Sequence, residues 1–133
     1  MPIYRPSNMQ GGAGSSGIVL FNGNPPTIIM EWGHYITDSV SLLSIQGGAL
    51  VGNSAVETIV VTFRILVDQS VVQEYSVRLA AGTYTSAFFG AEVLNADAGH
   101  RVCRITAQLT TGVSGDTAFI SSRQVTSISG TGV

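Results

Sequence analysis

Residues 57–79, ETIVVTFRILVDQSVVQEYSVRL, decide the fold of this chain. The first half alternates large apolar residues with other residues at a period of two, which is the pattern of a half-buried β-strand. The face expected to point into the core consists of Ile59, Val61, Phe63, Ile65 and Val67. A Val-Asp-Gln-Ser turn signal follows, and a second strand pattern begins at Val71. The stretch therefore predicts two strands joined by a hairpin turn.

Similar short segments rich in Val, Ile, Phe and Thr recur along the rest of the chain, separated by Gly, Pro, Asn and Asp. Their spacing of roughly 8–12 residues is typical of an antiparallel sandwich or barrel, and no long segment has a helical period. The predicted strands are 18–21, 27–32, 39–45, 49–51, 57–67, 71–79, 83–93, 100–110 and 117–129. In the 100–110 segment, Cys103 is expected on the apolar face together with Ile105.

The composition is poor in charge. Of 133 residues, 44% are hydrophobic and only 11% are charged, less than half of the roughly 25% usual for soluble domains. The six basic residues are all Arg, and eight acids give a net charge of −2. Nucleic-acid binding is not expected from this balance. A weakly charged surface instead favours association, so we expect a self-assembling protein.

The first seventeen residues, MPIYRPSNMQGGAGSSG, differ in composition from the rest. They are predicted to form a flexible N-terminal connector arm (1–17), followed by a single β-domain (18–133). The Gly/Ser-rich part is the predicted hinge, with Gly11, Gly12, Gly14 and Gly17. The segment lacks the apolar stretch of a secretory signal peptide, and no apolar run approaches the length of a membrane-spanning helix.

Few residues are candidates for chemistry. His34 and His100 are far apart in the sequence and have no Cys, Asp or Glu at metal-ligand spacing, so both are expected to be ordinary, partly exposed histidines. Cys103 is three residues from His100 on one predicted strand. The two side chains should therefore point to opposite faces and cannot form a nucleophile–base pair. Cys103 is interpreted as a small buried residue, with a reactive thiol or an intermolecular bridge as the alternatives.

The remaining candidates also have structural interpretations. Asp68 and Glu74 are expected to flank a hairpin turn, and Asp97 is expected in the Asp-Ala-Gly turn. The Gly11–Gly14 and Gly47-Gly48 clusters lack the lysine of a phosphate-binding loop, so we interpret them as hinges or turns. Trp32 and Tyr35 are either a sugar-binding shelf or, as we favour, core or interface packing. We predict no catalytic, cofactor-binding or metal-binding residue, and no enzymatic activity.

From Val56 to Ser129 the order of features resembles the tumour-necrosis-factor-like, or complement globular-head, jelly roll of bacterial spore-surface and phage-fibre proteins. The motifs that carry this resemblance are TIVVTFRILVD, VVQEYSVRL, AAGTYTSAFFG, an Asp-Ala-Gly turn, HRVCRITAQL and AFISSRQVTSIS. Gly82-Thr83-Tyr84 matches a recurring element of such proteins, whereas Cys103 stands where an aromatic residue is common. The resemblance implies an all-β antiparallel jelly-roll sandwich that forms a homotrimer, with an extended N-terminal arm.

The N-terminal segment resembles the connectors of bacterial endospore appendage subunits, in which a short extension docks into a neighbouring subunit. This resemblance implies a docking arm with Ile3, Tyr4, Arg5 and Met9, of which Ile3, Tyr4 and Met9 would be apolar anchors. Seventeen extended residues span at most about 55–60 Å, whereas a compact domain of this size has a diameter of about 36 Å. The arm is therefore long enough to reach the next subunit in a stack.

These observations lead to a functional expectation. The chain would be a structural subunit of an extracellular or spore-surface fibre, with homotrimers stacked head to tail through the arm and without nucleic-acid or membrane partners. Further partners would be an anchor protein and a tip protein of the fibre. The alternative is a trimeric ligand- or receptor-binding head of a spore or phage fibre that uses loops 22–27, 68–71 or 113–116. A viral capsid jelly roll is a third hypothesis, but an arm facing a genome would be more basic.

Overall fold

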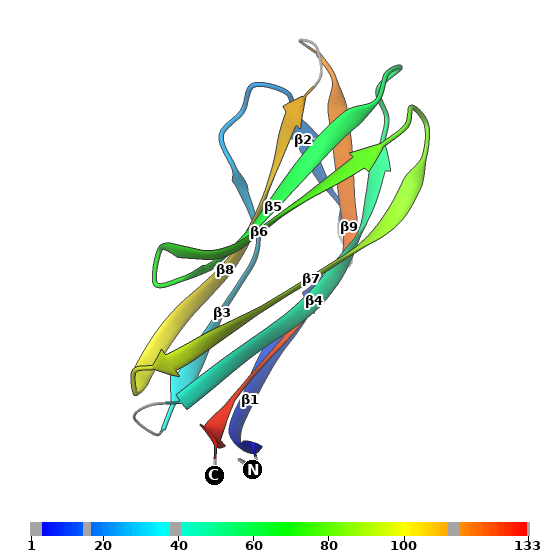
Figure 1. The fold of residues 1–133 in the computed structure, drawn as a ribbon. Helices are drawn as coiled ribbons and strands as arrows, with labels where there is room; N and C mark the ends of the chain where they lie inside the picture. Colours follow the sequence, from blue (N-terminus) through cyan, green and yellow to red (C-terminus); the bar gives the residue numbers. More distant parts are fainter. Residues whose placement is uncertain (1–3, 15–16, 38–40, 112–114, 133) are drawn as a thin grey trace.

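The computed structural model describes residues 4–14, 17–37, 41–111 and 115–132, and these form a sandwich of β-strands (Figure 1). The strands are β1 (Tyr4–Gly14), β2 (Ile18–Phe21), β3 (Thr27–Ile36), β4 (Ser41–Asn53), β5 (Ile59–Val67), β6 (Ser70–Leu79), β7 (Tyr84–Ala96), β8 (Gly99–Thr111) and β9 (Thr117–Gly132). No helix occurs among the described residues.

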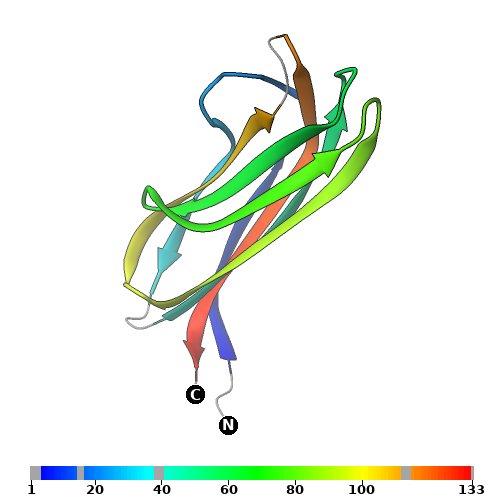
Figure 2. The ribbon, with the colours of Figure 1, turned by 45° about the horizontal axis from the view of Figure 1, so that its top comes forward.

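The strands form two sheets packed face to face (Figure 2). Sheet A has the order β1-β9-β4-β7, and β2 pairs with β9 beyond the end of β1. Sheet B has the order β3-β8-β5-β6. Each pairing between described strands is antiparallel. Two antiparallel sheets with these strand orders, packed face to face, make a jelly roll, so the predicted all-β, antiparallel jelly-roll sandwich is confirmed.

The hairpin predicted from residues 57–79 is present as β5 and β6. Its two-residue turn consists of Asp68 and Gln69, whose φ angles of 49° and 73° are typical of a type I′ turn. The alternating apolar residues of β5 point inward as expected, and they are fully buried apart from Val67, which is partly exposed. The strongest pattern in the sequence therefore identifies the centre of sheet B.

The core lies between the two sheets. On β8, Cys103 and Ile105 are completely buried, which confirms the predicted apolar face of that strand. Phe63 of sheet B and Phe89 of sheet A meet across the sandwich, with ring centroids 5.7 Å apart. Aromatic pairs at this separation contribute both buried area and a favourable ring geometry.

The prediction that Gly47-Gly48 forms a turn or hinge is wrong, because both residues lie inside β4. This strand continues through the two shorter strands predicted at 39–45 and 49–51. Gly47 pairs with Phe89 and Gly48 with Phe88 on the neighbouring β7. A Cβ atom on Gly47 would lie 2.5 Å from the carbonyl oxygen of Gln124 and 2.7 Å from a ring carbon of Phe89. The glycine is required by this close approach rather than by a turn.

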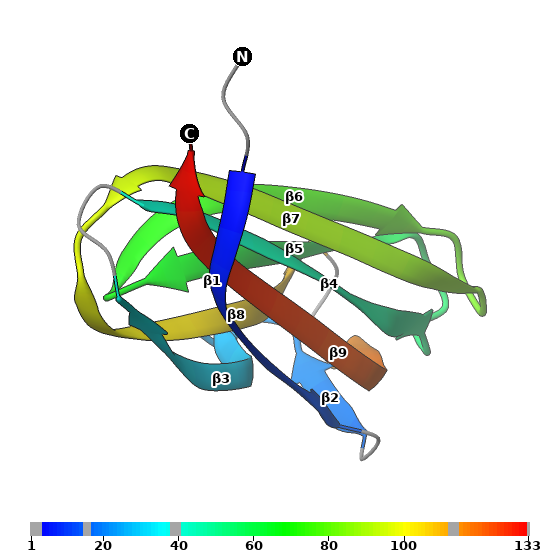
Figure 3. The same cartoon turned by 90° about the horizontal axis from the view of Figure 1, so that it is seen from below.

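The N-terminal segment also differs from the flexible arm that its composition predicted. Residues Tyr4–Gly14 form β1, which pairs with β9 from Tyr4 opposite Gly132 to Gly14 opposite Arg123, and β1 runs beside β9 in Figure 3. Backbone hydrogen bonds supply this pairing, so it needs no alternating side-chain pattern. Gly11, Gly12 and Gly14 are therefore part of a strand in this structure and not a hinge.

The remaining residues of the predicted arm are only partly described. Gly17 lies outside the strands and follows residues 15–16, which are outside the described residues. Ile3 is outside them too, and the side chains of Tyr4, Arg5 and Met9 are not described. Docking of this segment on another subunit therefore stays a prediction.

The glycine pair gives a stability prediction. Replacing Gly47 by Ala should destabilise the fold by about 1–3 kcal/mol, because the new Cβ would overlap the Gln124 carbonyl oxygen and the Phe89 ring. The matched control is Gly12→Ala, whose new Cβ would have only an ordinary contact, 3.6 Å from the terminal methyl carbon of Met30. Urea unfolding measures both. Equal midpoints for the two variants would contradict the role given to Gly47.

Candidate interaction surface

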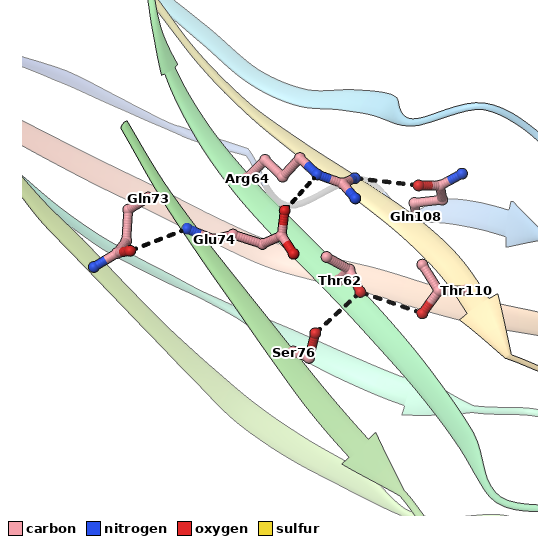
Figure 4. A network of polar contacts seen from close by, with 7 residues as sticks. All are labelled: Thr62, Arg64, Gln73, Glu74, Ser76, Gln108 and Thr110. Carbon is pink, nitrogen blue, oxygen red and sulfur yellow. Dashed lines mark hydrogen bonds and ion pairs between the residues drawn. The ribbon is translucent and has the colours of Figure 1, made fainter. Parts of the chain in front are cut away.

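The central part of the outward face of sheet B is polar and its side chains are paired with one another, whereas the edge strands β3 and β6 also carry the exposed apolar residues Ile28, Tyr35 and Val71. Figure 4 shows the central part, where the Arg64 side chain on β5 donates to Glu74 on β6 over 2.9 Å and to Gln108 on β8 over 3.1 Å. The Thr62 hydroxyl lies 3.1 Å from that of Ser76 and 3.2 Å from that of Thr110. These contacts cross three strands of the sheet.

Further ion pairs extend the polar character of sheet B. Arg104 on β8 donates to Glu31 on β3, and Arg101 donates to Asp68 in the β5–β6 turn over 2.7 Å. All of these charged groups keep some contact with solvent, so each pair contributes little to stability. Together they make this surface polar and ion-paired.

The outward face of sheet A has the opposite character. The strand register places Tyr84, Gly52, Phe119 and Val19 in one row across β7, β4, β9 and β2. We call the exposed large apolar residues on this side of sheet A the apolar patch. Its members are Val19, Phe21, Leu50, Tyr84, Phe88, Leu94 and Phe119. Tyr84 is 69% exposed and Phe88 79%, which is unusual for aromatic side chains in a domain of this size.

Three of these aromatic rings lie against glycines. A Cβ atom added to Gly52 would collide with the Tyr84 ring, and one added to Gly17 would collide with Phe119. A Cβ on Gly48 would lie 3.5 Å from a ring carbon of Phe88. An aromatic ring that covers a neighbouring glycine shields bare backbone and supports the sheet. One side of each of these three rings thus packs on a glycine, and the other side meets solvent.

Charge is scarce on this face. Among the side chains that the structure describes, Glu92 is the single charged group on the outward face of sheet A. Arg123 of β9 points the other way and is buried. An apolar, nearly uncharged sheet face opposite a polar, ion-paired one is typical of a contact surface for another macromolecule.

Inside the sandwich, a buried polar cluster joins the two sheets. Trp32 Nε1 of β3 donates to the Ser127 hydroxyl of β9 over 2.8 Å. The two ring nitrogens of His34 lie 2.7 Å from the hydroxyl oxygens of Ser127 and Ser129. Because Ser127 Oγ accepts from Trp32, its own proton suits an accepting Nδ1, and the Nε2–H then donates to Ser129. The geometry therefore fits a neutral imidazole.

This cluster corrects one prediction and settles another. His34 was expected to be partly exposed, but it is completely buried, and burial lowers its pKa. The alternation of Trp32, His34 and Ile36 in the sequence was the signal for this burial. Trp32 is a core residue, whereas Tyr35 points outward and is half exposed. The two aromatic residues therefore do not form a shelf.

Cys103 and His100 are separated as predicted. Cys103 faces the core, whereas His100 is exposed and its ring covers Gly33. Burial raises the pKa of the Cys103 thiol to about 11, with a smaller contribution from the negative charge of Asp68. The thiol is thus protonated at neutral pH, and its interpretation as a small buried residue is confirmed.

Asp68 occupies the turn predicted for it and holds that turn to β8. Its carboxylate accepts from Arg101 over 2.7 Å and from the backbone N–H of Val102 over 3.0 Å. These hydrogen bonds lower the pKa of Asp68. Glu74 lies on β6 and pairs with Arg64, and Asp97 lies in the short connection between β7 and β8. All three carboxylates therefore have structural positions.

The loops suggested for a ligand site do not form one surface. Loop 22–27 lies beside Asp116, whose carbonyl accepts from the Asn22 N–H over 3.1 Å. The turn at Asp68 lies near the other end of β8, because Asp68 contacts Val102 while Asn24 contacts Gln108. Residues 113 and 114 lie outside the described residues.

Sequence reasoning missed one buried side chain that organises the loops. Asn53, at the end of β4, donates through Nδ2 to the carbonyls of Glu57 (2.7 Å) and Leu79 (3.1 Å). Its Oδ1 accepts from the Ala55 N–H over 2.8 Å. An Asn in a loop gives no pattern that would distinguish this role from an exposed position.

Over the part of the chain that the structure describes, no group of three or more His, Cys, Asp or Glu side chains is placed to hold a metal ion. The same residues include no helix that could cross a membrane.

Comparison with known proteins identifies the architecture. No protein-family model and no curated protein sequence matches this chain. Among solved structures, a protein of infectious bursal disease virus, Gx strain, superposes with a TM-score of 0.64 at 15% identity, covering 93% of this chain and 33% of the viral chain. The VP2 subviral particle of the same virus gives 0.60 at 14% identity, covering 93% and 32%.

A second kind of neighbour has the same architecture. The insecticidal delta-endotoxin Cry8Ea1 of Bacillus thuringiensis superposes with a TM-score of 0.50 at 10% identity, covering 86% of this chain and 20% of the toxin. This chain spans about a third of the viral chains that it matches. At such low identity the likeness shows the jelly-roll fold alone.

The buried cluster predicts a pH dependence. Because the pKa of His34 is lowered in the folded chain, the unfolded chain binds an extra proton at mildly acidic pH. The free energy of unfolding should therefore fall as the pH decreases through the ordinary histidine range, from about 7 to 5. Asp68 affects a separate pH range. Because its pKa is lowered in the folded chain, its contribution to the free energy of unfolding is lost only as the pH falls below its ordinary pKa of 3.8.

Urea unfolding at a series of pH values measures this effect. His34→Gln should reduce the pH dependence between about pH 7 and 5, and the matched variant His100→Gln at an exposed position should keep it. The account of His34 is wrong if both variants retain the slope of the unmodified protein.

Proposed function

We propose that this chain is a non-enzymatic structural subunit that assembles with copies of itself. The observation that carries the proposal is the contrast between the two outward faces. Sheet B presents paired charges to water, whereas sheet A presents exposed aromatic residues and, among its described side chains, the single charge of Glu92. Burying the apolar patch against another copy would be favourable by roughly 25 cal/mol per Å² of apolar area.

In the finer form of the proposal, the subunits form homotrimers that stack head to tail into an extracellular or spore-surface fibre, with an anchor protein and a tip protein at its ends. A head-to-tail interface that does not close on itself propagates a filament. The buried Cys103 thiol and the structural roles of His34 and Asp68 support a role without catalysis.

The N-terminal strand is the proposed link between successive units. In the described chain, β1 forms its sheet pairing with β9 alone, at the edge of sheet A. If β1 of one subunit left this edge, β9 of a neighbour would offer it the same backbone partners. Such an exchange conserves hydrogen bonds, so modest additional contacts decide which arrangement is populated. The anchors Ile3, Tyr4 and Met9 would supply those contacts.

Deletion of residues 1–10 tests the link. The truncated chain should form discrete oligomers, whereas the full chain should form fibres, because the deletion removes most of β1. Negative-stain electron microscopy distinguishes the two outcomes, and circular dichroism checks that the truncated chain remains folded. Long fibres from the truncated chain would overturn the role of the arm.

A reversible disulfide between β1 and β9 gives an independent test. Unlike the deletion, it keeps β1 paired with β9 and so does not expose the β9 edge. Met9 and Ile128 are opposite each other on β1 and β9, so Met9→Cys with Ile128→Cys in a Cys103→Ala background can form a disulfide. The oxidised protein should form no fibres, and dithiothreitol should restore them. The matched control joins Ser44→Cys on β4 to Glu92→Cys on β7. Its oxidation should change nothing, and fibres from the oxidised Met9–Ile128 variant would contradict strand exchange.

A further inference from the structure

A hollow of about 310 Å³ lies beside Phe88 on the outward face of sheet A. Gly48 is opposite both Phe88 and Gln124 in the strand register, and Gln46 is opposite both Gly90 and Thr126. The hollow lies over these adjoining rows. Its lining consists of Gln46, Gly47, Phe88, Gln124, Val125 and Thr126.

The hollow exists because glycine leaves the backbone bare at this point. Gly48 contributes no side chain beside Phe88, and Gly90 contributes none beside Gln46. The rim is made of amide and hydroxyl groups, whose hydrogen bonds need no opposite charge. A cavity of about 150 Å³ is large enough to bind benzene. The space is therefore sufficient for a phenyl ring.

Phe88 is the projecting feature next to this space. Its ring leans on Gly48 and is 79% exposed, so most of its apolar surface meets water in the isolated chain. A projecting ring and a ring-sized hollow thus lie side by side on one face. A second copy of the same chain carries both features, so each copy can insert a ring into one neighbour and accept a ring from a neighbour.

Charge and area favour a second copy as the occupant. A charged partner surface would lose water against this face without gaining an ion pair, except near Glu92. Four strands spaced about 4.8 Å apart and about ten residues long cover roughly 600–650 Å². A stable interface buries about 800 Å² of accessible surface per partner. The accessible surface of a face with projecting side chains is larger than its projected area, so this face is of suitable size.

We propose that the Phe88 ring of one copy enters the hollow between β4 and β9 of a second copy. The inference rests on the proposed function and identifies the contact through which the subunits associate. In the complex, the entering ring packs on the Gly47-Gly48 backbone and beside the resident Phe88 ring. The Gln46 and Gln124 side chains then form the polar rim of the contact.

Two single variants that complement each other test this contact. Phe88→Ser removes the projecting ring and leaves the hollow, whereas Thr126→Trp fills the hollow and leaves the ring. Both positions are exposed, so the fold should be kept, and thermal unfolding checks this. Each variant by itself should associate at least about tenfold more weakly than the unmodified chain in sedimentation velocity. An equimolar mixture should form a 1:1 complex that neither variant forms alone.

Val71→Ser is the matched control, because Val71 is an exposed apolar residue on sheet B. It should associate like the unmodified chain. The inference is overturned if either Phe88→Ser or Thr126→Trp also associates normally, or if their mixture forms no complex. If Phe88→Ser forms normal fibres, the Phe88 contact is excluded, whereas the proposed function is not contradicted. An unmodified chain that stays monomeric and forms no fibres would overturn both.

Discussion

The structure depends on one stretch of strand pairing, in which two consecutive glycines lie opposite two consecutive phenylalanines. Gly47 and Gly48 of β4 lie opposite Phe89 and Phe88 of β7. On the inner side, the missing side chain of Gly47 lets the Phe89 ring approach the β4 backbone and meet Phe63 of the other sheet. On the outer side, the missing side chain of Gly48 leaves room for Phe88 and the hollow beside it. The same sequence feature therefore shapes the core and the candidate contact surface.

The different surface character of the two sheets follows from where the charged side chains lie. Arg64, Arg101 and Arg104 all lie on sheet B or at its edge, each with a carboxylate partner. The low charge of the whole chain is therefore unevenly distributed, and sheet A has few charges of any sign among its described side chains. The scarcity of charge that the composition shows is therefore concentrated, in the structure, on one particular face.

The sequence was informative where side chains alternate. The period-two patterns around Phe63 and Cys103 predicted both the strands and their buried faces, because burial of one face requires that alternation. The same rule separated Cys103 from His100. It also predicts that Phe88 and Phe89 point to opposite sides of β7, but only the register with β4 shows that both rings lie beside glycines.

Prediction failed where the backbone rather than the side chains determines structure. Glycine is depleted in strands, so Gly11–Gly14 and Gly47-Gly48 were interpreted as hinges or turns. Pairing with β9 and packing of Phe89 override that tendency, and neither partner is close in the sequence. The buried positions of Asn53 and His34 likewise depend on distant partners. Asn53 gave no periodic signal, and the alternation around His34 was outweighed by the usual exposure of histidine.

The position of the chain ends has a consequence for topology. Tyr4 and Gly132 are paired neighbours, so the start of β1 and the end of β9 lie side by side in the sandwich. A short linker between them, with the chain reopened at the Asp68-Gln69 turn, would give a circular permutant that keeps the described strand pairings. In that permutant the linker would hold β1 beside β9. Exchange of β1 between copies would then be hindered, although every described strand pairing is kept.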